Sequence, residues 1–375
     1  MILSTLSVSV LAGPVIPLPL VQTDLLEAMQ IVQDTHGRSG FQLTFRVQRQ
    51  LPGGLMDYEE ILSPLLKAGC RVSLVATLHS APFVLFDGVI TRRHLDPGAG
   101  LLHVMGEDLG VLMDLESRQE GHVGMPDVAI VGRILATYAV HGVQPVIVPP
   151  KLPRPPDVRQ PVRIQQSTDL SYLKKLARDA GYLFFLEPGP APGTTLAYWG
   201  PPRRTAPAQP ALSIRMGGAS NVNSLRFQHD ALAPTRVAGA VQDRDSGLSV
   251  PVKTYLSSRL PPLATHPGLL GSLARTEVLP PATASAPYAA ALAQSRTDLA
   301  SDQVVTAEGD LDVVRYGVPL RAGYTVGVRG AGYTHDGLYH VDRIIHRVQM
   351  SDRSFTQSFS LSREGTGSTT PVVLP

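Results

Sequence analysis

Apolar and polar side chains alternate along much of this chain, and that period of two restricts the fold to one rich in β-strands. In "FQLTFRVQRQ", Phe41, Leu43, Phe45 and Val47 would share one face, while the polar residues between them share the other. Successive side chains of a strand point to opposite faces, so the segment predicts a half-buried strand. The segments "RVSLVATL", "FVLFDGVITRRHL" and "LLHVMGEDL" continue the series, with a helix expected between strands in "MDYEEILSPLLKAG".

Helical patterns gather in the middle of the chain. The segments "EDLGVLMDLESRQ" (107–119) and "MPDVAIVGRILATYAVHG" (125–142) each predict a helix, and a proline-rich connector occupies 149–163. The stretch "STDLSYLKKLARDAGYLFFLEP" (167–188) then predicts a capped helix that runs directly into an aromatic strand. That strand is expected to pair with "TTLAYWG" through the turn "GPAPG".

Strand patterns resume after residue 212. They are interrupted by a loop-like stretch at 258–285, whose prolines disfavour regular structure, and by an alanine-rich helix at about 288–299. That helix could bind a partner, but packing against its own β region is the favoured interpretation. The end of the chain, "GTGSTTPVVLP", is expected to be a mobile tail.

The two β regions resemble each other in order and spacing. Each has Ala-Gly, then a strand with a valine three residues after the glycine (Val72, Val326), and then a strand opened by an aromatic residue (Phe83, Tyr339). This weak repeat predicts two similar small antiparallel barrels, because closure of a barrel removes exposed sheet edges.

Composition excludes several classes of function. The net charge is +2 and basic residues are scattered, so a nucleic acid is not an expected partner. Charged residues are 17% of the chain, against roughly 25% in typical soluble domains. Either a GC-rich genome or a surface covered by neighbouring subunits would explain that deficit. Cys70 is the single cysteine, so neither an intrachain disulfide nor a cysteine-based zinc site is expected, and an inert buried thiol is the favoured interpretation.

Neither a signal peptide nor a membrane span is expected. The apolar opening has no Lys or Arg before Arg38, and Pro14, Pro17 and Pro19 interrupt the helix that a signal peptide requires. No segment approaches 18 uninterrupted apolar residues.

Three histidines that lie close together in sequence are candidate metal ligands. On a strand His335 and His340 would fall on opposite faces, whereas His340 and His346 would share one. No carboxylate or cysteine completes a ligand set at a suitable spacing, so surface or pore-lining positions are the favoured interpretation and no metal is expected.

Two pairs of carboxylates are candidate acid–base groups, Asp243 with Asp245 and Asp310 with Asp312. Glycosidases use paired carboxylates, but both segments are better interpreted as turns. No nucleophile elbow, zinc-binding helix or phosphate loop occurs. We therefore expect no catalytic residue, no cofactor and no enzymatic activity.

The capped helix and its strand carry a resemblance to a known family. Hub proteins of contractile injection systems have an acidic-capped helix with the pattern Asp-Leu-x-Tyr/Phe-Leu-x-x-Leu-Ala, followed by glycine and an aromatic strand. The matching positions are Asp169, Leu170, Tyr172, Leu173, Leu176, Ala177, Gly181, Tyr182, Phe184 and Phe185. The relatives are the phage late control protein D group and the N-terminal half of VgrG-type spike proteins. The segments "FDGVITRR", "HVMGEDLGVLMD" and 319–364 are similar to that family in the same order.

The resemblance implies a mainly β fold in which two tube-like antiparallel β-barrels flank a small α/β domain. The expected divisions are 1–120 (first barrel), 121–211 (α/β domain), 212–365 (second barrel) and 366–375 (tail). It also implies a homotrimer that adapts a hexameric inner tube to a separate threefold spike, with baseplate wedge components as neighbours. Such a protein is assembled in the bacterial cytoplasm and belongs to a virion tail or phage-tail-like particle. A tail-associated cell-wall hydrolase or a carbohydrate-binding β-protein remains the alternative.

Overall fold

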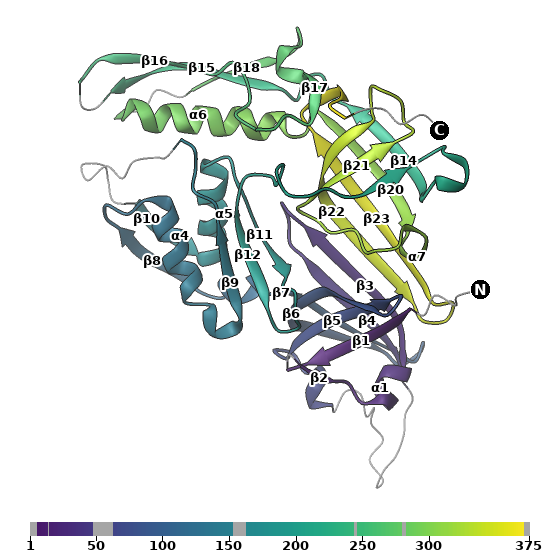
Figure 1. The fold of residues 1–375 in the computed structure, drawn as a ribbon. Helices are drawn as coiled ribbons and strands as arrows, with labels where there is room; N and C mark the ends of the chain where they lie inside the picture. The colour runs from purple at the N-terminus through teal and green to yellow at the C-terminus, as the bar shows by residue number, and fades with distance from the viewer. Residues whose placement is uncertain are drawn as a thin grey trace.

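A single large sheet dominates the computed structural model, which describes residues 6–13, 15–47, 63–152, 163–243, 246–279 and 283–370. This sheet has 13 strands and runs through both of the predicted β regions. Figure 1 shows it on the right of the molecule, with the helical middle region on the left. The expectation of a mainly β chain is confirmed.

The sheet consists of two units with the same strand order, and all neighbours within each unit are antiparallel. The first unit runs β3 (Leu26–Asp34), β4 (Gly40–Arg46), β7 (Leu101–Asp108), β6 (Ala81–Asp96) and β5 (Arg71–Leu78). The second runs β14 (Val222–His229), β20 (Val305–Asp312), β23 (Ser354–Arg363), β22 (Gly337–Gln349) and β21 (Thr325–Arg329). Short strands extend the sheet beyond β5 and β21, namely β1 (Ser7–Ala12), β2 (Ile16–Pro17) and β13 (Gln209–Ser213).

The two units also share two irregularities at equivalent positions. The first strand of each carries an extra residue after its first pair, Glu27 in β3 and Asn223 in β14. The long fourth strand of each carries another, Thr91 in β6 and Asp342 in β22. Because bulges interrupt pairing at defined positions, their recurrence supports a structural repeat better than strand order alone.

The bulges correct part of the predicted repeat. Gly88 and Tyr339 are equivalent because each lies three residues before the bulge of its strand, Thr91 or Asp342. Val72 of β5 pairs with Gly88 and Val326 of β21 pairs with Tyr339, so the two valines are also equivalent, as predicted. Tyr339 therefore corresponds to Gly88, not to Phe83. The aromatic match was wrong because β6 begins further ahead of its bulge than β22 does.

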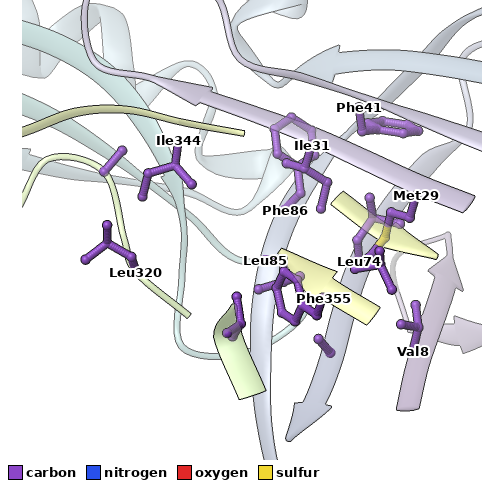
Figure 2. Packing of buried hydrophobic residues seen from close by; sticks show 14 of the residues in the cluster. Val8, Met29, Ile31, Phe41, Leu74, Leu85, Phe86, Leu320, Ile344 and Phe355 are labelled. Atoms are coloured by element: carbon purple, nitrogen blue, oxygen red, sulfur yellow. The ribbon is translucent and has the colours of Figure 1, made fainter. Parts of the chain in front are cut away.

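The two units are joined by pairing between β22 and β3, in which residues 343–349 lie opposite residues 34–28. Two separate closed barrels are not confirmed: within the described residues the strand path is open, from β14 at one end to β2 at the other. The largest hydrophobic cluster draws on both units. Figure 2 shows Ile31 of β3, Phe86 of β6 and Phe355 of β23 in this shared core.

The middle region has its own core, in which Trp199 and Leu173 are fully buried. Its elements are α4 (Asp127–Ala136), α5 (Asp169–Asp179), β9 (Val143–Ile147), β11 (Leu183–Pro188) and β12 (Thr195–Gly200). The predicted hairpin of β11 and β12 is confirmed, and Thr168 caps α5 by accepting a hydrogen bond from Ser171 N. The sequence did not reveal that β9 pairs in parallel with β12.

The helix predicted at 107–119 is largely wrong. Only α3 (Gly110–Met113) is helical there, because the following polar residues form β8 (Ser117–His122), which pairs with β10 (Arg163–Thr168). A partner strand more than 40 residues away overrides the local helical pattern. The helix expected between strands at 56–69 lies mostly outside the described residues, and residues 64–66 form a 3-10 turn.

The loop predicted at 258–285 contains three short strands, β17 (Ala264–Pro267), β18 (Arg275–Val278) and β19 (Thr283–Ala284). Two of them join β15 (Thr235–Asp243) and β16 (Ser249–Lys253) in a small sheet that covers α6 (Ala286–Ser301), as Figure 1 shows at the top. The predicted tail also begins differently, because β24 (Gly365–Ser368) pairs with β17. These strands have two to four residues, too few to produce an alternating pattern. The remaining helices are α1 (Leu20–Asp24) and α7 (Val313–Tyr316).

Candidate functional site

The three histidines that are candidate metal ligands occupy separate environments. The ring of His335 stacks on Phe227 with centroids 4.5 Å apart, and His340 Nδ1 lies 2.9 Å from Asp342 Oδ1. His346 Nδ1 is 3.0 Å from Gln357 Nε2. Within the described residues, no group of three His, Cys, Asp or Glu side chains is placed to hold a metal ion.

The structure corrects the predicted surroundings of these histidines. The bulge at Asp342 reverses the alternation of β22, so His346 aligns with the core residue Ile344 while His340 does not. Both side chains are buried, so surface or pore-lining positions were wrong for them. Burial lowers the pKa of His346 to about 3, which keeps the ring neutral at physiological pH.

Asp342 fastens the junction between the two units. Thr35, directly after β3, donates both its backbone N–H (3.0 Å) and its hydroxyl (3.1 Å) to the carbonyl oxygen of Asp342. The side chain of Asp342 also receives His340 and His36, the latter with Nε2–Oδ1 at 3.6 Å. Burial alone would raise the pKa of Asp342, but these two hydrogen bonds lower it instead. The cluster around Asp342 therefore stabilises the pairing of β22 with β3 and has a structural role.

The carboxylate pairs also have structural roles. Asp243 ends β15 and accepts hydrogen bonds from Ser246 N and Ala286 N, so the predicted turn is present and the same carboxylate caps α6; Asp245 lies outside the described residues. The turn predicted around Asp310 and Asp312 is wrong, because both lie on β20. Asp312 caps α7 through Val314 N at 2.8 Å.

The exposed face of the second unit carries a ladder of polar side chains across four strands. Asp310 of β20 accepts hydrogen bonds from Ser224 of β14 (3.0 Å) and from Ser358 of β23 (2.5 Å). Arg347 of β22 donates in turn to Ser358 Oγ at 2.6 Å. A shallow depression lies along this ladder and also includes Glu308, Arg226 and Arg343. These side chains alternate with buried apolar ones, which explains why the sequence shows a period of two.

The first unit carries a related ladder at equivalent positions. Thr44 and His103 are direct partners on β4 and β7, as Asp310 and Ser358 are on β20 and β23. Thr44 Oγ1 lies 3.1 Å from His103 Nδ1, and the ring of His103 stacks on His94 of β6 with centroids 6.1 Å apart. One face of the joined sheet therefore carries a polar ladder in each unit, with Ile345 and Val32 on the same face between them. The alternation predicted such a face, but only the strand pairing brings its residues together.

A second hollow lies beside α6 and the middle region, with a volume of about 490 Å³. Three of its arginines, Arg203, Arg204 and Arg259, are paired with carboxylates of the same chain. Arg203 is paired with Glu187, and Arg259 binds Asp302 (2.7 Å) and the carbonyl oxygen of Gly181 (2.7 Å). In the same hollow, Asp298 accepts hydrogen bonds from both the backbone N–H (2.7 Å) and the hydroxyl (2.5 Å) of Ser258. Cys70 is half-buried, not buried as expected, and is a free thiol.

Comparison with known proteins identifies the fold. No family model and no curated protein sequence matches the chain. Solved structures do match: a tail protein from Neisseria meningitidis MC58 has a TM-score of 0.62 and 17% identity, over 96% of this chain and 98% of that chain. The 43 kDa tail protein of prophage MuSo2 from Shewanella oneidensis has a TM-score of 0.58 and 13% identity, over 96% and 99%.

A component of the type VI secretion system of E. coli, itself structurally similar to bacteriophage T4 tail proteins, also matches. Its TM-score is 0.52 with 12% identity, over 99% of this chain and 80% of that chain. Identities this low establish a common fold and no more. The chain therefore has the fold of phage tail proteins, as the resemblance in its sequence implies. No helix within the described residues is long and apolar enough to cross a membrane.

Proposed function

We propose that this protein is the homotrimeric baseplate hub of a contractile phage tail or phage-tail-like injection system, in the manner of the late control protein D group. It would seat a hexameric inner tube on one side and a separate threefold spike on the other, surrounded by wedge components. Assembly would occur in the bacterial cytoplasm, and the mature protein would belong to the tail or particle.

One observation carries this proposal: a single chain holds two β units with the same strand order and two bulges at equivalent positions, joined edge to edge. Three such chains around an axis would present six similar units to a hexamer while keeping threefold symmetry for a spike. The similarity in fold to phage tail proteins supports the same role. Tube-like closure would then belong to the assembly and not to the single chain.

The polar face suits a structural role. Its charged side chains are hydrogen-bonded to side chains of neighbouring strands, as Asp310 and Arg347 are to Ser358. Such a surface can line a channel or contact polar partners, and we propose that it performs no catalytic step and needs no cofactor. We further propose the divisions 1–120, 121–211 and 212–365 as the first tube unit, the middle domain and the second tube unit.

The proposal is tested by the mass and shape of the purified chain. Light scattering should give the mass of a trimer, and electron microscopy should reveal a threefold ring with a central opening. A monomer that releases fragments from peptidoglycan would instead establish the hydrolase alternative. A monomer that binds polysaccharide without cleaving it would establish the carbohydrate-binding alternative.

A further inference from the structure

The sheet has two edges whose strands lack a partner on one side. Among the described residues, β14 pairs only with β20, so residues 224–229 expose one backbone edge. Residues 92–96 of β6 pair only with β7, because the pairing between β5 and β6 ends at Val89. Unpaired edges of this kind are templates for another strand.

The junction inside the chain indicates how these edges would be used. Beyond its bulge, β22 leaves β21 and pairs with β3, the first strand of the other unit. The bulges define the equivalent positions: Arg92 corresponds to Arg343, and β14 corresponds to β3 with Ser224 matching Ala28. The segment of β6 beyond its bulge is therefore the counterpart of the joining segment of β22, and β14 is the counterpart of β3.

We propose that residues 92–96 of one copy pair antiparallel with residues 226–230 of the next copy, repeating between chains the β22–β3 junction within the chain. This rests on the proposed trimeric hub and names the surface that would assemble it. The contact is head-to-tail, so three chains would form a ring in which each unit is joined to two others.

The equivalent register places opposite charges together. Inside the chain Arg343 lies opposite Asp34, with Nε–Oδ2 at 3.8 Å. The counterpart of Asp34 is Asp230, so Arg92 would lie opposite Asp230. Four residues along, Asp96 would lie opposite Arg226, a second pair of opposite charge. Both Arg92 and Arg226 are exposed, and among the described residues neither forms a hydrogen bond or ion pair through its side chain, although Arg226 lies opposite Glu308 of β20.

The local conformation of the two aspartates agrees with this equivalence. Asp34 Oδ1 accepts the N–H of His36, two residues on, at 2.8 Å. Asp230 Oδ1 accepts the N–H of Leu232, also two residues on and also at 2.8 Å. The same turn thus ends both first strands and leaves the second carboxylate oxygen free for an arginine. Between the charged pairs, Leu95 would face Phe227, where His346 faces Ile31 within the chain.

Disulfide cross-linking tests the pairing directly. In a Cys70→Ser background, His94→Cys with Gln228→Cys would lie directly opposite each other in neighbouring copies, at a separation that a disulfide spans. Oxidation should give covalent trimers on a non-reducing gel, and reductant should abolish them. Ile345→Cys with Val32→Cys is the matched control, because the same register places that pair within one chain. His94→Cys with Arg226→Cys, two residues out of register, should cross-link at least tenfold less.

Each outcome decides between the two proposals. Trimers in solution that do not cross-link, while the control pair oxidises, would overturn the strand pairing and leave the hub. Covalent ladders longer than trimers would support the pairing and overturn the closed hub. A monomer at all concentrations would overturn both.

Charge exchange gives a second readout. Asp230→Arg and Arg92→Asp should each weaken assembly at least tenfold, because like charges would meet at every interface. The double variant R92D/D230R should restore assembly to within about threefold of the parent. Failure of the double variant to recover, with each single variant folded, would contradict the proposed register.

Discussion

Replacing Arg204 with Met should destabilise the chain by about 3 kcal/mol, because Arg204 is a buried cation that ties together three distant segments. Its guanidinium lies 3.0 Å from Asp302 Oδ1 and 3.0 Å from Glu364 Oε1, and its side chain is only 3% exposed. Removing one partner of a buried ion pair costs about 3–5 kcal/mol, since the remaining charge keeps its desolvation penalty. Arg259 still binds Asp302 at 2.7 Å, so we expect the lower end of that range.

Urea unfolding at a fixed protein concentration would measure the effect. Fluorescence of Trp199, the single tryptophan and fully buried, and far-UV circular dichroism should give coincident transitions if unfolding is two-state. Arg38→Met is the matched control: Arg38 also contacts two carboxylates but is 58% exposed, so its loss should cost less than about 1 kcal/mol.

A double variant separates the charge from the packing. Arg204→Met with Glu364→Leu should cost less than the sum of the two single variants, because neither buried charge is then left alone. The reasoning would be refuted if Arg204→Met cost no more than Arg38→Met.

Three further predictions concern the core, a cap and pH. Phe355→Ala should cost about 3–5 kcal/mol in urea unfolding because the ring is fully buried, whereas Leu115→Ala, at 70% exposure, should stay within about 0.5 kcal/mol; equal costs would refute the core assignment. Thr168→Ala should cost about 1 kcal/mol through loss of the cap of α5, and an unchanged midpoint would contradict that role. His346 has a pKa of about 3 in the folded chain and 6.5 in the unfolded chain. Between these two values only the unfolded chain binds a proton at this residue, so the free energy of unfolding decreases as the pH is lowered. His346→Gln should therefore reduce the loss of stability between pH 7 and pH 5 by about 2 kcal/mol, and an unchanged slope would refute it.

Local signals sufficed for several elements of the fold. The capped helix α5 and the hairpin that follows were predicted because the capping residues, apolar stripe and turn are all contiguous in sequence, and the structure identifies the cap as Thr168. The helices α4 and α6 were predicted for the same reason. For the candidate site, the alternation along β4 predicted that one face of a strand would be polar, whereas Asp310 and Asp312 of β20 were predicted as a turn.

The remaining features depend on pairing between distant segments. Strands as short as β17 and β24 exist only because each has a partner about 100 residues away. The bulge at Asp342 reversed the faces of His340 and His346, and nothing local in the sequence marks a bulge.

The sequence by itself determined several of the longer strands, the helices α4, α5 and α6, and that the β pattern occurs twice, because alternation, apolar stripes and capping residues are short-range properties. Only the tertiary structure decided that β22 leaves its own unit to pair with β3, so that two units form one open sheet. The backbone N–H and C=O groups that pair strands are the same in almost every residue, so the sequence does not directly specify which strands pair. The register of the pairing is set by where bulges, buried faces and chain connections together allow the hydrogen bonds to form.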